Sequence, residues 1–233
     1  MSGMALTEYK KRRSFKKTPE PTGGKAAREA LQFVVQKHDA TRLHYDFRLE
    51  LKGVLKSWAV PKGPSLNPAE KRLAMLVEDH PFDYKNFEGI IPEGNYGAGT
   101  VIIWDEGTYE PVEELEKKSA QEKHLLKAFQ NGSMKIRMHG KKLKGEFALV
   151  RTQGRGENSW LLIKHRDKFA SEKDIRDKDK SVVSGKTIER MAKNQKGNRW
   201  KSNRASTGNN PRTPKKTGKR KNDRQEVENE RNR

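Results

Sequence analysis

The sequence contains no cysteine, which excludes disulfide cross-links and thiolate metal sites and fits a reducing compartment. Apolar residues are also scarce, at 31% of the chain, compared with about 45–50% in average globular proteins, a figure that counts glycine as well. No apolar run approaches the ~20 residues of a membrane span, and no apolar segment of a signal peptide follows the start. We therefore expect a soluble, cytoplasmic protein, part of whose chain stays unfolded.

Positive charge is abundant. The 233 residues include 51 Lys and Arg against 31 Asp and Glu, a formal net charge of +20. A polyanion gains counterion-release free energy from each cation that it meets, so nucleic acid is the expected partner, in association with the nucleoid. Residues 186–233 alone hold 16 basic and 5 acidic residues and almost no apolar ones. This composition predicts a disordered basic tail that contacts DNA phosphates.

The pattern divides the chain into four parts: a basic arm at residues 1–30, a domain at 31–170, a linker at 171–185 and the tail at 186–233. Within the domain, apolar residues recur with period two between Gly, Pro and Asn turns, which is typical of short strands. One helix is predicted at residues 119–130. Together the segments indicate a mainly β barrel or sandwich. The predicted strands are 31–37, 43–51, 54–60, 72–79, 100–105, 134–139, 145–151 and 159–165.

One predicted strand has an unusual polar face. Its odd positions over residues 43–51 form an unbroken apolar face, while His44, Asp46, Arg48 and Glu50 line the other. A face that only needs solvation usually carries Lys, Glu, Thr and Ser. The His-x-Asp-x-Arg pattern therefore indicates a functional site.

The spacing on this face suits a metal ion. Same-face neighbours lie about 6.6–7 Å apart along a strand, so His44 and Asp46 can converge on one ion, and a short turn at residues 39–42 would bring His38 beside them. Two nitrogen ligands and one oxygen ligand leave positions open for water or substrate and suit Mn²⁺ or Zn²⁺. Arg48 follows on the same face, and its planar guanidinium matches phosphate oxygens.

The glycine-rich segment 92–99 has the composition of a phosphate-binding loop. It lacks a Gly-Lys-Ser/Thr ending and precedes a predicted strand, so we interpret it as a tight turn and not as a phosphate loop. No motif for a serine or cysteine nucleophile is present.

Five blocks of this sequence resemble the 3′-phosphoesterase domain of bacterial and archaeal DNA ligase D. They are FVVQKH at 33–38, RLHYDFRLE at 42–50, KSWAVPKGPS at 56–65, VEDHP at 77–81 and FEGIIPEGNYGAG at 87–99. The resemblance extends from about Tyr9 to Phe169. It implies a compact, closed β-barrel of about eight strands with one or two short flanking helices and a crescent-shaped groove.

The resemblance also implies an activity. We expect a hydrolase that uses Mn²⁺, or another divalent metal such as Co²⁺ or Zn²⁺, at the 3′ ends of DNA primer-templates in non-homologous end joining. In this family a terminal ribonucleoside is removed to leave a 3′-phosphate, which is then hydrolysed to a 3′-hydroxyl. The enzyme is thus expected to be both a 3′-phosphodiesterase and a 3′-phosphomonoesterase.

Carried over residue by residue, the resemblance assigns three groups of site residues. The metal ligands would be His38, His44 and Asp46. The catalytic residues would be Arg48, Lys62, Tyr84 and a protonated His80. The substrate-binding residues would be Arg13, Glu20, Gln36, Arg72 and Glu78.

This chain departs from the family's pattern at Ser14, which follows Arg13 where the family often has an aspartate. We expect the diesterase step to be weaker than the monoesterase step for this reason. The polymerase and ligase modules of the family are absent from the sequence. We therefore expect a free-standing monomer that meets a separately encoded DNA ligase, polymerase/primase and Ku.

Two other classes of protein fit parts of the pattern. A non-catalytic nucleic-acid-binding module would explain the charge and leave the histidines structural, but it would not need the His-x-Asp-x-Arg strand. A phosphodiesterase for small cyclic nucleotides would need the site but not the net charge of +20.

Overall fold

The computed structural model describes residues 6–25, 29–154 and 156–193. Most of them belong to strands, and the helices are short. Along the chain the elements are α2 (Thr7–Lys11), β1 (Leu31–Asp39), β2 (Leu43–Leu51), β3 (Val54–Val60), β4 (Lys71–Pro81), the 3₁₀ helix η1 (Phe82–Asn86), β5 (Gly89–Ile91), β6 (Gly99–Pro111), α3 (Lys118–Gln130), β7 (Ser133–Gly140), β8 (Lys144–Arg151), β9 (Ser159–Lys164), the 3₁₀ helix η2 (Ile175–Asp177) and α4 (Ile188–Lys193).

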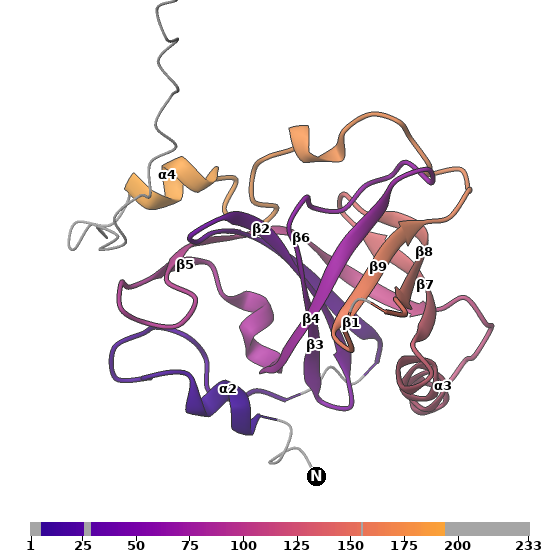
Figure 1. Ribbon diagram of the computed structural model, residues 1–233, viewed down its shortest axis with the longest axis horizontal. Helices are drawn as coiled ribbons and strands as arrows, with labels where there is room; N and C mark the ends of the chain where they lie inside the picture. Colours follow the sequence, from indigo (N-terminus) through magenta and orange to yellow (C-terminus); the bar gives the residue numbers. More distant parts are fainter. Residues whose placement is uncertain (1–5, 26–28, 155, 194–233) are drawn as a thin grey trace, which may run out of the picture. The chain divides into compact units, whose positions relative to one another are not determined.

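Eight antiparallel strands close into a barrel (Figure 1). The ring runs β1-β2-β3-β4-β9-β8-β7-β6 and returns from β6 to β1, while β5 pairs with the start of β6. Closure pairs the edges that an open sheet would expose. The predicted fold, a closed barrel of about eight strands, is confirmed.

Two glycines let β6 run close to its neighbours at the closure. A Cβ added to Gly99 would lie 2.2 Å from the carbonyl oxygen of Asp39, and one added to Gly107 would lie 2.2 Å from the carbonyl oxygen of His139. Neither position can hold a larger side chain without moving backbone. The sequence therefore needs glycine at the positions where β6 lies against β1 and β7.

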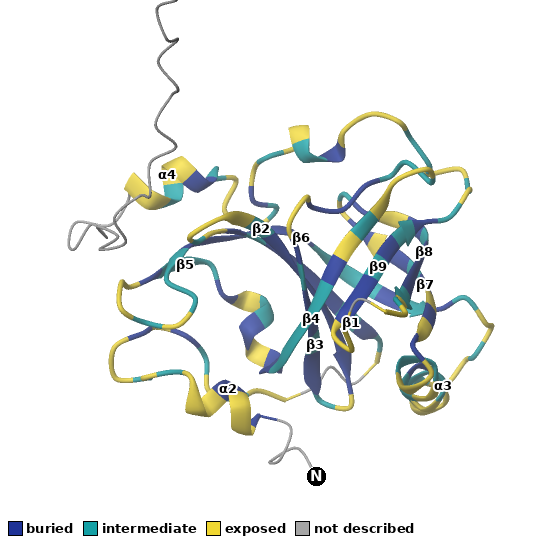
Figure 2. Ribbon diagram, in the orientation of Figure 1, coloured by how far each residue is buried: buried dark blue, intermediate teal, exposed yellow. Residues whose placement is uncertain are grey.

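The barrel interior is filled by large aromatic and aliphatic side chains from alternate strand positions. Trp58, Trp160 and Phe129 pack together, with the last two rings stacked at 5.5 Å between centroids. Figure 2 shows the buried residues along the strands, whereas the residues of α3 are exposed or partly buried except for Leu125, which is fully buried. Burying each fully buried side chain of this core contributes about 1.5–3 kcal/mol to the stability of the barrel.

A second apolar cluster holds the N-terminal arm against the barrel. Tyr9 of α2 is fully buried among Phe82, Tyr84 and Phe87, which belong to η1 and the residue that follows it. The hydroxyl of Tyr9 donates a hydrogen bond of 2.6 Å to the carbonyl of Pro21, which fastens the two ends of the arm together. This packing positions the basic residues of the arm beside β4.

The predicted strand boundaries need several corrections. Leu43 was assigned to the apolar face of β2, but it is 45% exposed because it lies at the barrel's rim, beyond the core. The strand predicted at 100–105 continues to Pro111, and β5 was not predicted at all. Three-residue strands such as β5 are too short to show a period.

The C-terminal boundary also differs from the prediction. The segment expected to be a linker contains η2, whose Ile175 is buried in the main core, and residues 188–193, expected to be disordered, form α4 with Ile188 buried. Trp104 and Lys142 donate to the carbonyl of Lys178 at 2.8 and 2.6 Å and hold this segment down. Single buried isoleucines among polar residues leave no periodic signal. The tail from residue 194 onward lies outside the described residues.

No helix in the described part of the chain is long and apolar enough to cross a membrane.

Candidate metal centre

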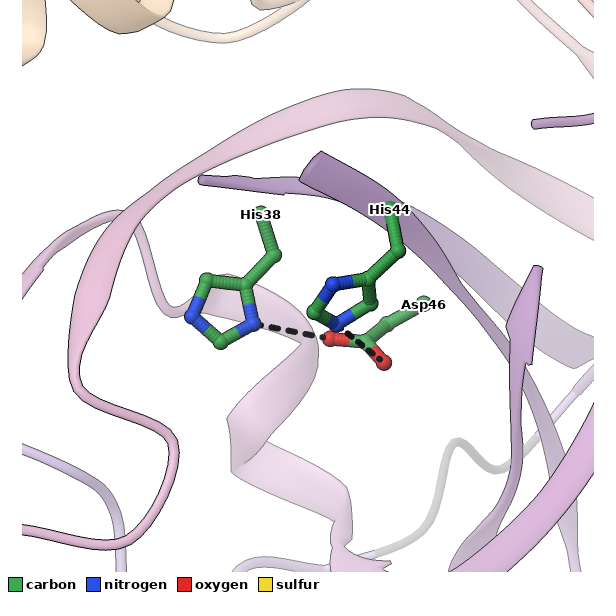
Figure 3. A group of neighbouring side chains, drawn as sticks. All are labelled: His38, His44 and Asp46. Atoms are coloured by element: carbon green, nitrogen blue, oxygen red, sulfur yellow. Dashed lines mark ion pairs between the residues drawn. The ribbon is translucent and has the colours of Figure 1, made fainter. Parts of the chain in front are cut away.

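The β1–β2 hairpin brings His38, His44 and Asp46 together, as Figure 3 shows. His38 is paired directly with His44 in the register of the two strands, and Asp46 lies two residues further along the same face of β2. The Nδ1 of His38 lies 3.5 Å from Oδ2 of Asp46, and the Nε2 of His44 lies 3.7 Å from Oδ1. One ligand atom from each residue falls within 4.8 Å of the others. This spacing is compatible with three ligands to one ion.

Each of the two imidazoles presents one nitrogen to Asp46. The Nδ1 of His44 lies 2.8 Å from the carbonyl of Arg42, which can only accept, so the hydrogen belongs on Nδ1 and Nε2 has a lone pair. The Nδ1 of His38 faces Asp46, and the buried Nε2 on the other side of that ring has no hydrogen-bond partner among the described residues. One nitrogen from each imidazole and the carboxylate oxygens of Asp46 therefore face one another. The donor set therefore fits a divalent transition metal.

Arg48 is held rigidly beside this group. Its Nε donates to Gln36 at 2.7 Å and its Nη1 to Ser57 at 2.9 Å, while Nη2 lies 3.1 Å from Asp46. Burial acts to raise the pKa of Asp46, but the Arg48 guanidinium, followed by His38, outweighs it and holds that pKa well below its ordinary value. Asp46 is therefore an anion at neutral pH, as a metal ligand has to be.

The N-terminal arm supplies a second arginine. Arg13 donates to Glu20 at 2.9 Å and to Glu78 at 3.1 Å, and its Nη2 lies 3.1 Å from Nε2 of His80. Its guanidinium also lies over the Tyr9 ring, 4.0 Å from the centroid. These contacts join the arm to β4, so residues about 65 positions apart in sequence share one charged cluster.

His80 is neutral in this arrangement. Its Nδ1 lies 2.9 Å from the carbonyl of Glu78, which can only accept, so Nε2 accepts from Arg13. Burial, and then the charges of Arg48 and Arg13, lower the pKa of His80 well below its ordinary value. A protonated His80 does not fit these contacts in the free protein, and protonation of His80 during turnover stays a prediction. A bound phosphate dianion would act in the opposite direction.

Tyr84 and Gln36 connect the two arginine clusters. The Tyr84 hydroxyl donates to Glu20 at 3.0 Å, and its ring lies 4.9 Å from the Arg48 guanidinium. Burial, followed by the charge of Glu20, raises the pKa of Tyr84 well above its ordinary value, so the hydroxyl keeps its proton. The amide of Gln36 donates to the carbonyls of Tyr84 and Phe87 at 3.0 and 2.9 Å. Both residues position the arginines.

These residues surround a cavity of about 220 Å³. A larger cavity, of about 770 Å³, lies along β7 and β8 and is lined by none of the predicted site residues. The smaller one has the stronger claim to be the functional site because its charged groups are buried, whereas the paired Arg137 and Glu146 of the larger one are partly exposed. Its lining residues are Arg13, His38, Ala40, His44, Asp46, Arg48, Ala59, Val77, Glu78, His80, Tyr84, Ile91, Tyr96 and Gly97.

Four predicted site residues lie outside this lining: Glu20, Gln36, Lys62 and Arg72. Glu20 and Gln36 contact it indirectly, because they accept hydrogen bonds from Arg13 and Arg48. Lys62 has an exposed position after β3, where its carbonyl accepts from Arg176 at 3.1 Å. Arg72, at the start of β4, pairs with Glu70. Their roles in binding or catalysis stay predictions.

The structure also adds residues that the sequence did not single out. Tyr96 lines the cavity, Ser57 accepts from Arg48, and Tyr9 supports Arg13. The sequence contained only indirect indications of these residues. Tyr96 lies in the glycine-rich segment interpreted as a turn, and Ser57 occupies a strand position where polar residues are common.

The fold and the site define a β-barrel protein with a His₂Asp group beside buried arginines. A sequence profile of the DNA Ligase D 3′-phosphoesterase domain matches residues 36–151. The chain therefore belongs to this family through those residues, as its motifs indicated.

Curated relatives agree with this family. The chain is 47% identical over 195 residues to the Multifunctional non-homologous end joining protein LigD of Pseudomonas aeruginosa, which covers 80% of this chain and 22% of that protein. It is 45% identical over 158 residues to the Multifunctional non-homologous end joining DNA repair protein LigD of Mycobacterium tuberculosis, or 67% of this chain and 19% of that protein. The chain thus spans about a fifth of the length of these relatives.

Proposed function

We propose that this protein is a metal-dependent phosphoesterase that heals the 3′ ends of DNA strands during non-homologous end joining. The observation that carries the proposal is the His38, His44 and Asp46 group placed beside Arg48 in one buried cavity. The domain family and the names of its LigD relatives support the same reaction and pathway. The net charge of +20 suits a DNA substrate.

The proposed metal is Mn²⁺, with Co²⁺ or Zn²⁺ as alternatives, held by His38, His44 and Asp46. When bound, it would supply Lewis-acid polarisation of the phosphoryl oxygens and lower the pKa of a coordinated water. The depressed pKa of Asp46 keeps this ligand ionised over the whole neutral range. The lone pair on Nε2 of His44 is oriented by the Arg42 carbonyl, which keeps the ring in one tautomer.

The protein's own residues would bind and orient the terminal phosphate. Three N–H groups of Arg48 are already engaged by Gln36, Ser57 and Asp46, which leaves others of its five donors for phosphate oxygens. Arg13 adds a second positive charge opposite. Because both guanidiniums are held before substrate arrives, little reorganisation is needed as charge develops on the phosphoryl oxygens.

Neutral His80 and Tyr84 can move or hold protons. The Nε2 lone pair of His80 faces the cavity side where Arg13 lies, so a phosphate that recruits Arg13 would free this nitrogen for a proton. Tyr84 donates to Glu20 and so keeps the carboxylate that orients Arg13 in place. A 3′-hydroxyl end is what a DNA ligase seals. A separately encoded ligase, polymerase/primase and Ku are accordingly the proposed partners.

A single assay tests this function. A 5′-labelled primer, annealed to a template and ending in a 3′-phosphate or a single 3′-ribonucleotide, is incubated with the protein and Mn²⁺. We expect conversion to a 3′-hydroxyl end, with a 3′-phosphate intermediate from the ribonucleotide substrate, and loss of both products in EDTA. A cyclic dinucleotide serves as the comparison substrate. Binding of the primer without turnover would favour a non-catalytic nucleic-acid-binding module. Faster turnover of the cyclic dinucleotide would favour a phosphodiesterase for small cyclic nucleotides.

A further inference from the structure

We propose that Tyr96 is a stacking surface for the base of the nucleotide that carries the scissile phosphate. This inference rests on the phosphoesterase function proposed above and concerns how the same site recognises its substrate. It comes from the loop between β5 and β6, at residues 92–98, whose sequence was interpreted as a turn. The structure places this loop at the cavity.

The loop is a fixed support. The side-chain amide of Asn95 donates to the carbonyl of Pro92 at 3.0 Å, and the backbone N–H of Ala98 donates to the carbonyl of Asn95 at 3.2 Å. Gly97 has a φ of 75°, and a Cβ added there would lie 3.9 Å from Cε1 of His38. Gly97, which follows Tyr96, therefore lies close to a proposed metal ligand, and both residues line the same cavity.

The Tyr96 ring is exposed where a buried one would be expected. It is 46% exposed, yet it lines the cavity, which the other large exposed apolar side chains in the described part of the chain do not. Its hydroxyl accepts from Nη1 of Arg12 at 3.0 Å. The guanidiniums of Arg12 and Arg13 lie 5.2 and 5.3 Å from its centroid. Aromatic rings beside arginines form the stacking surfaces of single-strand binding sites.

The cavity is too small to enclose a whole nucleotide, so the base would lie beside the Tyr96 ring. Its volume of about 220 Å³ is below the ~300–1,000 Å³ of pockets that enclose a drug-sized ligand. A terminal phosphate and its sugar fit this space, with the phosphate between Arg48 and Arg13. The attached base would then lie outside this space, beside the partly exposed ring of Tyr96.

The test compares primers with and without a terminal base. Both primers end in a 3′-hydroxyl, the product form, so that no turnover occurs with Mn²⁺ present, and one has an abasic site as its last nucleotide. We expect the wild-type Kd to be about tenfold weaker for the abasic primer, because stacking contributes about that much per base. In Tyr96→Ala the ratio of the two Kd values should fall to about one. A terminal 2-aminopurine should be quenched by the wild type and not by this variant.

Two matched variants separate stacking from other roles. Tyr96→Phe keeps the ring but loses the bond to Arg12, so it should keep the tenfold ratio. If it behaves like Tyr96→Ala, the residue acts by holding Arg12 and the proposal is wrong. Phe169→Ala removes an exposed aromatic ring outside the cavity, and it should also keep the ratio.

The outcomes also separate this inference from the proposed function. A wild-type ratio near one, or an unchanged ratio in Tyr96→Ala, overturns the stacking surface even if 3′-phosphate turnover is normal. A tenfold ratio that depends on the Tyr96 ring supports the stacking surface even if no 3′-end turnover is found, in which case only the phosphoesterase function fails.

Discussion

Two regions of the described structure bury charged side chains, among others, and differ in what completes those charges. Beside α3, the carboxylate of Glu50 is fully buried and accepts from Lys118 at 2.7 Å and from the backbone of Gln32 at 3.0 Å. In the β1–β2 cluster, by contrast, the Nε2 of His38 has no partner among the described residues, and a cavity adjoins the charges.

The difference shows how to distinguish a structural charge from a functional one. Glu50 lies on the same predicted strand face as Asp46, so sequence position does not separate them. Where the protein itself completes every hydrogen bond, the charges hold elements together. Where hydrogen-bond donors and lone pairs beside a cavity have no partner in the protein, they are available to bind a ligand or an ion.

The largest expected effect is loss of activity in the β1–β2 cluster. Asp46→Ala or His44→Ala should lower turnover of both 3′-phosphate and 3′-ribonucleotide substrates by about a thousandfold or more, since a catalytic metal supplies several kcal/mol. Calorimetry should show that Mn²⁺ binding is lost as well. His139→Ala, which removes an exposed histidine, is the control. Wild-type activity in either variant would rule out the metal site.

Beside α3 we expect a loss of stability without a loss of activity. Lys118→Met leaves Glu50 buried without its cation and should lower the free energy of unfolding by about 3–5 kcal/mol, as measured by urea denaturation. Turnover at a temperature where the variant is folded should match the wild type. The double variant Lys118→Met/Glu50→Gln should recover part of the stability. A selective loss of activity in the folded single variant would contradict the distinction between the two regions.

A smaller effect is expected at Ser14, which adjoins Arg13 in the arm and is exposed. Ser14→Asp should raise diesterase turnover about tenfold without a matching rise in monoesterase turnover, which is less than the ~10²–10⁴ of a fully positioned acid–base group. Rates on the two primers give the comparison, with Ser14→Asn as the uncharged control. Equal changes in both steps would show that the carboxylate has no role specific to the diester.

The smallest effect concerns Lys142, which binds the carbonyls of Lys178 and Lys180 at 2.6 and 2.7 Å. Burial, despite nearby Asp105, lowers its pKa from 10.5 to about 8. Between these pH values the unfolded chain binds the proton and the folded protein does not, so the folded state gains stability as the pH rises.

The stability difference between the wild type and Lys142→Met should therefore grow from pH 8 to pH 10.5 and be flat below pH 8. Urea denaturation across this range measures it. Lys141→Met, at an exposed neighbouring position, is the control. A flat difference throughout would mean that Lys142 titrates normally in the folded protein.

Local sequence was enough to predict the hairpin and the proximity of His38, His44 and Asp46. The period of two puts His44 and Asp46 on one face of β2, and a short turn brings His38 beside them. The turn covers residues 40–42, one residue fewer than predicted, and this length pairs His38 with His44. The barrel class followed from eight segments in which apolar and polar residues alternate. These features depend on contacts between residues close in sequence.

Only the tertiary structure could decide the rest. Arg13 meets Glu78 and His80 across 65 and 67 residues, and this contact depends on Tyr9 burying itself against η1. The same long-range packing makes His80 neutral, since the pKa of His80 depends on burial and on the charges of Arg48 and Arg13. Residue type and spacing determine which groups can serve a site. Which of them share one desolvated cavity is set by how distant segments close over it, and no local pattern encodes that.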